Sequence, residues 1–225
     1  MTLQVQTPSE ENLKKESQVL GYPKVTPDMS LIRAYFAERQ GVVAAELRNP
    51  HVENPVSQLV RSSAKDSAVL LPIVNHANGP TVIVTRRHPR IRFAGHICFP
   101  GGRVDATDNS FIDTALRETR EEINLATSKI EVVGSLGDYY TQAGYKISPV
   151  VGIIEPPFSV EANPDEVSEI HEISLARVLD ASSYALTWHR PDHGHFSFTE
   201  GDISISGPTV SLLIGLYEAL LNPEK

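Results

Sequence analysis

Three glutamates in one segment of the chain have the spacing of a cation-binding group. Glu118, Glu121 and Glu122 stand at positions i, i+3 and i+4 of the stretch FIDTALRETREEI. On a helix this spacing places the carboxylates on neighbouring turns, within reach of a common point. Like charges so close repel one another unless a cation joins them, and hard divalent cations prefer oxygen ligands. The segment therefore predicts a site for Mg²⁺ or Mn²⁺, with substrate phosphates completing the coordination.

The surroundings of these glutamates favour this interpretation over a simple solvated helix face. Arg117 precedes Glu121 by four residues, so it can pair with that carboxylate and hold it in one rotamer. The helix follows a strand, a turn that contains Gly101 and Gly102, and a polar loop. Adjacent glycines let the backbone turn tightly and approach an anion closely. This strand, loop and helix order is typical of a cradle for phosphate and metal.

The helix that carries the glutamates is expected to bury one apolar stripe. Its members recur at steps of three and four residues, which places them on one face. They are Ile112, Ala115, Leu116, Thr119 and Ile123. We expect this stripe to face the core and the glutamates to occupy the opposite side.

The remaining patterns predict an α+β fold with mixed β-sheets. Residues 67–75 and 81–87 form a hairpin rich in β-branched residues, followed by a short strand at 96–99. Further strands are expected at 129–140, 146–155 and 166–174, a short helix at 175–179, a hairpin at 185–191 and 195–205, and a closing helix at 208–221.

The N-terminal part differs from the rest in composition. Residues 1 to about 25 are polar without apolar periodicity and predict a loose tail. A helix is expected over 26–40, with Thr26 as N-cap and Leu31, Tyr35 and Phe36 as its apolar stripe. Residues 49–66 are expected to be an irregular connection. The chain thus divides into an N-terminal tail and helical extension, 1–65, and a main domain, 66–225.

Composition excludes several classes of partner. A net charge of -8 argues against broad binding to nucleic acid or anionic membranes, which need a basic face. An anionic small molecule would meet a repulsive field, so bound cations would help to bring it to the protein. A single cysteine, Cys98, excludes an internal disulfide framework. The N-terminus lacks a secretory pattern, so we expect a cytoplasmic protein. A homodimer is left open.

The stretch GGRVDATDNSFIDTALRETREEINL resembles the signature box of Nudix hydrolases. Asn124 stands where that box ends in glycine, and asparagine tolerates the left-handed conformation that closes a helix. The resemblance implies a Nudix-type α/β/α sandwich, a small nucleotide-like substrate, catalytic roles for Glu121, Glu122 and Arg117, and metal binding by Glu118, Glu121 and Glu122. The positions that match the box are Gly102, Asp108, Arg117, Glu118, Glu121 and Glu122.

Flanking residues resemble the coenzyme A pyrophosphatase-like branch of that family. They are Thr85-Arg86-Arg87, Ile91-Arg92, the run from Gly95 to Gly102, and Asn163-Pro164-Asp165-Glu166-Val167. The segment between Arg92 and Gly95 is one residue shorter than in the branch, and His96 replaces a common glutamine.

This second resemblance implies cleavage of coenzyme A or an acyl-coenzyme A to 3′,5′-ADP and 4′-phosphopantetheine. The implied substrate-binding residues are Arg86, Arg87, Arg92, Gly101 and Gly102, because arginine forks bind phosphate well. Glu166, otherwise an ordinary exposed acid, becomes an additional metal ligand or base.

Three alternatives remain open at the level of sequence. The same chemistry could act on ADP-ribose, NADH or a nucleoside triphosphate. The fold could also serve as a ligand sensor without catalysis, although all three glutamates are retained. Arg86 and Arg87 could simply be solvated at a strand end.

Overall fold

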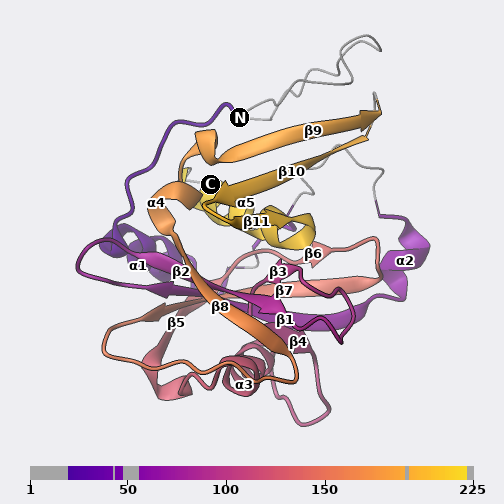
Figure 1. Cartoon of the computed structure of the whole chain (residues 1–225), viewed down its shortest axis with the longest axis horizontal. Coiled ribbons are helices and arrows are strands. Elements are labelled where there is room, and N and C mark those ends of the chain that lie inside the picture. The colour runs from indigo at the N-terminus through magenta and orange to yellow at the C-terminus, as the bar shows by residue number, and fades with distance from the viewer. Residues whose placement is uncertain (1–19, 43, 48–55, 191–192, 222–225) are drawn as a thin grey trace.

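The computed structural model describes residues 20–42, 44–47, 56–190 and 193–221, which form two sheets and five α-helices (Figure 1). The larger sheet has eight strands and contains both parallel and antiparallel pairs. Its strands are β1 (Lys65–Val74), β2 (Thr81–Arg87), β3 (Ile97–Cys98), β4 (Gly101–Arg103), β5 (Ile130–Ser135), β6 (Tyr139–Tyr140), β7 (Tyr145–Ile154) and β8 (Val167–Ser174). The predicted α+β class with a mixed sheet is confirmed.

Layers cover both faces of this sheet. Helix α3 (Phe111–Ile123) lies on one side, while α5 (Gly207–Leu221) and a three-stranded sheet lie on the other (Figure 1). The smaller sheet has the order β11-β10-β9, from β9 (Tyr184–Arg190), β10 (His193–Glu200) and β11 (Ile203–Ser206). The predicted α/β/α arrangement is therefore present. Among the described residues, no helix combines the length and apolarity that a membrane span requires.

Strands β1 and β7 form the centre of the large sheet. They run parallel from the pair Lys65–Tyr145 to the pair Val74–Ile154, and most of their side chains are buried. A strand that is covered on both faces is apolar along its whole length rather than at alternate positions. This explains why LLPIV and VVGII appear in the sequence as continuous runs.

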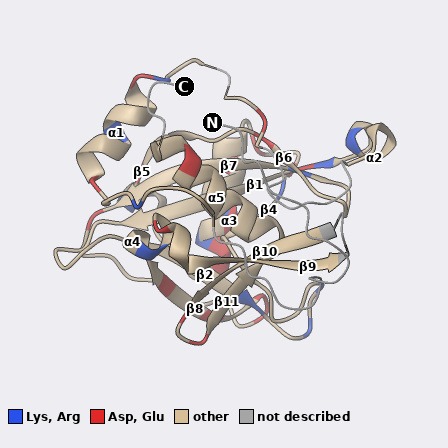
Figure 2. Ribbon diagram, turned by 90° about the horizontal axis from the view of Figure 1, so that it is seen from above, with Lys and Arg blue, Asp and Glu red and all other residues tan. Residues whose placement is uncertain are grey.

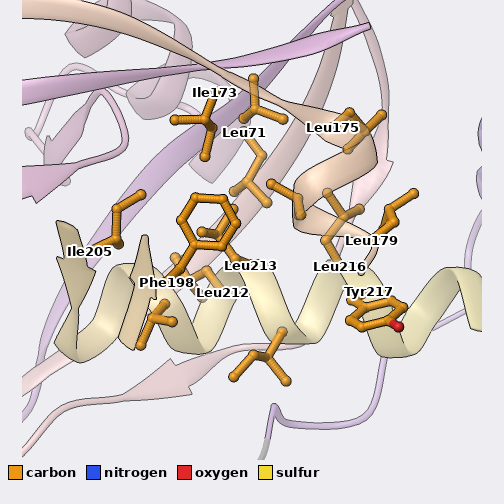
Figure 3. Close-up of a cluster of buried hydrophobic side chains, with 14 of the residues drawn as sticks. Leu71, Ile173, Leu175, Leu179, Phe198, Ile205, Leu212, Leu213, Leu216 and Tyr217 are labelled. Atoms are coloured by element: carbon orange, nitrogen blue, oxygen red, sulfur yellow. The ribbon is translucent and has the colours of Figure 1, made fainter. Parts of the chain in front are cut away.

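The main core lies between the large sheet and α5 (Figure 3). Leu213 and Leu216 of α5 lie in one cluster with Leu71 of β1, Phe198 of β10 and Leu175 of α4 (Leu175–Val178). Helix α5 is apolar nearly all round because most of its residues are buried. The predicted short helix and closing helix are both confirmed within a residue at their ends.

The boundaries of α3 are those expected, but its buried face is different. Ala115, Thr119 and Ile123 are buried as predicted. Ile112 is 38% exposed, whereas Glu122 is only 3% exposed. The prediction that all the glutamates lie opposite the core was therefore wrong for Glu122. The Gly101 amide donates a hydrogen bond to this buried carboxylate, and the apolar periodicity of the helix contains no information about such a partner.

The N-terminal extension is packed into the core rather than only attached to it. Helix α1 (Met29–Ala37) buries Ile32 and Phe36, and its N-cap is Asp28. The prediction of Thr26 as N-cap was wrong, because the Asp28 carboxylate accepts two amide hydrogen bonds at the first turn. Leu31, placed in the buried stripe, is 37% exposed.

Two further expectations about this extension are changed by the structure. The tail was expected to reach about residue 25, but Leu20 is 2% exposed and the amide of Val25 donates to the Leu179 carbonyl at 2.9 Å. Residues 1–19 lie outside the described residues. The connection expected to be irregular contains α2 (Gln58–Ser62), capped by Ser57. A division between 1–65 and 66–225 remains a proposal.

Replacing Phe36 with alanine tests whether α1 belongs to the core. Its ring is 3% exposed and contacts the backbone region of Gly134, where an added Cβ would lie 2.6 Å from the ring. Loss of such a ring leaves a cavity, so Phe36→Ala should lower the unfolding free energy by about 3–5 kcal/mol. Urea unfolding would measure it. Leu31→Ala, at an exposed position of the same helix, should change little, and similar values for the two variants would contradict this packing.

Candidate active site

The glycine turn at the start of β4, Gly101-Gly102, requires glycine at both positions for different reasons. Gly101 has a φ of +154°, and a Cβ there would lie 2.4 Å from the Ala68 carbonyl oxygen of β1. A Cβ on Gly102 would lie 2.4 Å from the carboxyl carbon of Glu118 on α3. The first glycine lets β4 pair with β1, and the second leaves room for a carboxylate. The turn therefore links the sheet to the acidic helix.

Glu122 is the most buried acid of α3. The amide of Gly101 donates to its Oε2 at 3.2 Å. Burial above all, together with the negative charges of Glu118 and Glu166, raises the pKa of Glu122 to about 8, against the opposing effects of the Gly101 hydrogen bond and the positive charge of Arg87. A carboxylate in this position is a strong candidate for binding a cation or a proton.

Glu118 and Glu121 lie along the same helix but in different surroundings. The side chain of Glu118 is 15% exposed and that of Glu121 is 54% exposed. Burial raises the pKa of Glu118, with Glu121 and Glu166 contributing and Arg117 opposing. Glu118, Glu121 and Glu122 are called the acidic group below, and Glu121 is its solvent-exposed member.

Arg117 holds this acidic group in place. Its Nη1 donates to Glu118 at 2.9 Å and to Glu121 at 3.0 Å. The predicted pair with Glu121 is therefore present, yet the closest two-point contact is to Asp108, whose Oδ1 and Oδ2 accept from Nε and Nη2 at 2.9 Å each. Nη2 also donates to the Arg103 carbonyl at 3.2 Å. One guanidinium thus joins β4, the loop between β4 and α3 that contains Asp108, and α3 itself.

Asp108 serves as the anchor for Arg117. Its side chain is 4% exposed and also accepts from the Thr114 hydroxyl at 2.8 Å and from the Asp105 amide at 2.9 Å. These donors, Arg117 first, hold the pKa of Asp108 well below its usual range. Asp108 therefore stays charged and fixes the position from which Arg117 reaches the glutamates.

Glu166 approaches the same group from outside the helix. The Asn163 amide donates to the Glu122 carbonyl at 2.8 Å, and the His88 amide donates to the Glu166 carbonyl at 2.8 Å. These bonds fix the loop before β8 between the end of α3 and the end of β2. The charge of Glu166 acts on both Glu118 and Glu122. The structure thus places Glu166 close enough for its charge to act on two of the three glutamates.

The three predicted arginines have separate positions. Arg87 lies beside the acidic group, where its charge lowers the pKa of Glu122. Arg86, its neighbour on β2, pairs instead with Glu169 of β8 at 2.7 Å, because successive side chains of a strand point to opposite faces. Arg92 donates to the Tyr145 hydroxyl at 3.4 Å. Of the three, Arg87 is the one whose charge acts on Glu122.

The expected convergence of the three glutamates on a single point is met only in part. Glu118 and Glu121 share Arg117, and Glu122 binds the glycine turn. Within the described ranges, no three acidic, histidine or cysteine side chains are gathered closely enough to hold a metal ion as they stand. The donor set nevertheless fits a hard cation, because Glu118 and Glu122 are carboxylates whose pKa values are raised by burial and by neighbouring negative charges.

Comparison with known proteins identifies the family. The sequence pattern of the NUDIX domain matches residues 64–198, which include every residue of the group described above. The chain belongs to the Nudix hydrolase family. Nudix hydrolases are pyrophosphohydrolases of nucleoside diphosphate derivatives and generally use divalent metal ions such as Mg²⁺ or Mn²⁺, and the chain is assigned to that class.

Curated relatives carry the same family name. A Nudix hydrolase called NudL from Photorhabdus laumondii, described as uncharacterized, is 40% identical over 131 residues, covering 58% of this chain and 70% of the relative. The protein of the same name from Escherichia fergusonii is 43% identical over 121 residues, covering 53% and 62%. The matched region thus spans between three fifths and three quarters of these relatives.

Solved Nudix structures show more distant similarity. RenU from M. smegmatis has a TM-score of 0.45 and 16% identity, covering 68% of this chain and 84% of its own. The NUDIX domain of Shewanella oneidensis NrtR, complexed with ADP ribose, has a TM-score of 0.42 and 19% identity, covering 64% and 85%.

Some features of this Nudix site were visible in the sequence and others were not. Asn124 closes α3 with a φ of 51°, as expected for the position where the signature box has glycine. The burial of Glu122 and the contact between Arg92 and Tyr145 were missed, since they join residues that are distant in sequence.

Charged positions elsewhere are interspersed, with Lys and Arg scattered among Asp and Glu across the described ribbon (Figure 2).

Glu122→Gln should flatten the pH dependence of stability in the cation-free protein. Burial raises the pKa of Glu122 from 4.5 to about 8, so between these values the folded protein holds a proton that the unfolded chain has released. This bound proton contributes fully to the unfolding free energy below the unfolded pKa of 4.5, and the contribution is lost as pH rises through the folded pKa of about 8. The loss is at most about 1.4 kcal/mol per pH unit. Glutamine has no such proton to release.

Urea unfolding with EDTA, between about pH 5 and about pH 9, would measure these slopes. Glu38→Gln is the matched control away from these glutamates, at an end of α1 where the side chain is 71% exposed, and it should keep the wild-type slope. Equal slopes in the wild type and in Glu122→Gln would show that the carboxylate is not desolvated.

Proposed function

We propose that this Nudix hydrolase uses Mg²⁺ or Mn²⁺ to hydrolyse the diphosphate linkage of coenzyme A or an acyl-coenzyme A, giving 3′,5′-ADP and 4′-phosphopantetheine. The observation that carries the catalytic part is Glu122, a carboxylate that is 3% exposed, fixed by the Gly101 amide and close to two more acids. The choice of coenzyme A rests on the resemblance of the segments around Arg86, Arg92 and Glu166 to that branch of the family.

The residues that would hold the cation are Glu118, Glu121 and Glu122, with Glu166 as a further ligand or base. Their mutual repulsion and the burial of two of them favour a bound divalent ion. When bound, such an ion neutralises diphosphate charge and lowers the pKa of water. The glycine turn leaves the space that the Glu118 carboxylate occupies.

The chain's own groups have distinct proposed roles. Arg117, anchored by Asp108, holds Glu118 and Glu121 in position. Glu121, Glu122 and Glu166 are the candidates for accepting a proton from the attacking water. Arg87, whose charge acts on Glu122, would bind a phosphate next to the glutamates, while Arg86 would have to exchange its partner Glu169 for substrate.

Other Nudix substrates are the alternatives to coenzyme A. ADP-ribose, NADH and nucleoside triphosphates share the diphosphate that the acidic group would bind, but they lack the 3′-phosphate of coenzyme A. A sensor without catalysis would bind such ligands and leave them intact. Retention of Glu118, Glu121 and Glu122 with Arg117 holding two of them favours catalysis.

Glu122→Gln should lower turnover by at least about a hundredfold, since removal of a catalytic carboxylate costs on that order. Product formation with Mg²⁺ would be followed by chromatography, and circular dichroism would verify the fold. Glu38→Gln, a matched change at an exposed end of α1 where the side chain is 71% exposed, should retain wild-type turnover. Wild-type turnover in Glu122→Gln would remove this carboxylate from the mechanism.

Coenzyme A should be cleaved more efficiently than dephospho-coenzyme A. The two differ only in the 3′-phosphate, for which Arg92 and Arg86 are the proposed partners. We expect a lower kcat/KM without that phosphate, and a smaller difference in Arg92→Ala. A chromatographic screen that includes ADP-ribose, NADH and nucleotides would compare rates. Preference for one of those ligands over coenzyme A would reassign the substrate within the family, and no cleavage of any would favour the sensor.

A further inference from the structure

Phe93 has an unusual backbone conformation in the loop between β2 and β3. Its φ is 61°, and among the described residues it shares positive φ with only one other residue that is not glycine, Asn124. Left-handed φ is unfavourable for a bulky side chain and persists where surrounding structure enforces it. The ring gains little from burial in return, because the residue is 46% exposed.

Backbone hydrogen bonds hold Phe93 in this conformation. The Gly95 amide donates to the Arg87 carbonyl and the Arg87 amide donates to the His96 carbonyl, each at 3.0 Å. The His96 amide donates to the Phe93 carbonyl at 3.2 Å. The loop is therefore a fixed extension of β2, and it presents the aromatic ring to solvent in a defined place.

Cationic and aromatic groups adjoin the ring of Phe93. The guanidinium carbon of Arg92 lies 4.7 Å from the centre of this ring and 6.0 Å from that of Tyr145. The Tyr145 hydroxyl accepts from Arg92 at 3.4 Å. The centre of the His96 ring lies 6.1 Å from that of the Phe93 ring. An exposed ring with a guanidinium beside it offers a flat surface for a planar group and a donor for an anion.

This surface is connected directly to the acidic group of α3. The Nε of Arg87 donates to the Arg92 carbonyl at 3.1 Å, one residue before Phe93. The charge of the same Arg87 acts on Glu122. A ligand whose diphosphate binds at the glutamates would therefore extend past Arg87 toward Arg92 and Phe93.

We propose that Phe93 is the stacking surface for the nucleobase of the substrate and thereby determines specificity for nucleoside diphosphate derivatives. The inference rests on the proposed function, in which the diphosphate binds at the glutamates. Aromatic rings stack on any base through its π-face, while Arg92 supplies a charged donor next to the ring. The exposed, strained ring is thus explained by a ligand that covers it.

Binding of 1,N6-etheno-ADP with Mg²⁺ tests this assignment, because the fluorescence of the modified base changes on stacking. Loss of one base–ring stack corresponds to roughly 5- to 150-fold in affinity. Phe93→Ala and Phe93→Gly should weaken binding within that range, and Phe93→Tyr should restore it. Inorganic pyrophosphate, which has no base, should compete equally well against the wild type and the variants.

Thermal unfolding separates this role from a structural one. Phe93→Gly removes the cost of the left-handed conformation, so its Tm should equal or exceed that of the wild type while its affinity falls. Leu59→Ala on α2, where the side chain is 79% exposed, is the control and should bind normally.

Three outcomes would overturn the inference. They are wild-type affinity for the etheno nucleotide in Phe93→Ala, an equal loss of pyrophosphate affinity in that variant, and no nucleotide binding by the wild type. Stacking by the wild type without hydrolysis of any diphosphate would overturn the proposed function alone and leave the base-binding surface standing.

Discussion

The burial of one carboxylate, Glu122, constrains the whole candidate active site. Glu122 points to the glycine turn instead of to solvent, and a buried acid is tolerated only if it is protonated, hydrogen-bonded or paired with a cation. The Gly101 amide provides one hydrogen bond, and Arg87 contributes positive charge nearby. Because Gly101 can make this bond only while β4 pairs with β1, the environment of Glu122 depends on the alignment of the sheet.

Arg117 connects this buried group to the surface. Its guanidinium contacts Asp108, the Arg103 carbonyl and two glutamates, so it joins the loop after β4 to α3. Five donors in a fixed plane allow one arginine to make contacts that a lysine could not reproduce. Binding of a divalent cation would compete with Arg117 for Glu118 and Glu121. Because Arg117 is anchored on Asp108, it would keep its position if those two carboxylates turned to a cation.

The rest of the molecule supports the sheet that positions this site. The large core between the sheet and α5 includes residues from α1, β10 and α4, so segments far apart in sequence stabilise the same strands. Small apolar clusters under α3, such as Ala68, Leu70, Ala115 and Val150, hold the helix against the opposite face. The acidic group consequently lies on a helix whose orientation is fixed by packing.

The sequence by itself determined the elements and the chemistry of the acidic segment. Residues of β1, β2, β7 and α3 could be located because their apolar periods and turn residues are local properties of the chain, and the left-handed cap at Asn124 follows from the same local chemistry. Tertiary structure decided which side chains are desolvated and which meet. Glu122 is buried where the Gly101 amide, distant in sequence, supplies a hydrogen-bond donor. In α1, Ile32 is buried in place of the expected Leu31. Arg86 pairs with Glu169 rather than joining Arg87, because neighbouring side chains of β2 point to opposite faces of the sheet. Burial and pairing between segments arise from the assembled fold, so no local pattern in the sequence contains them.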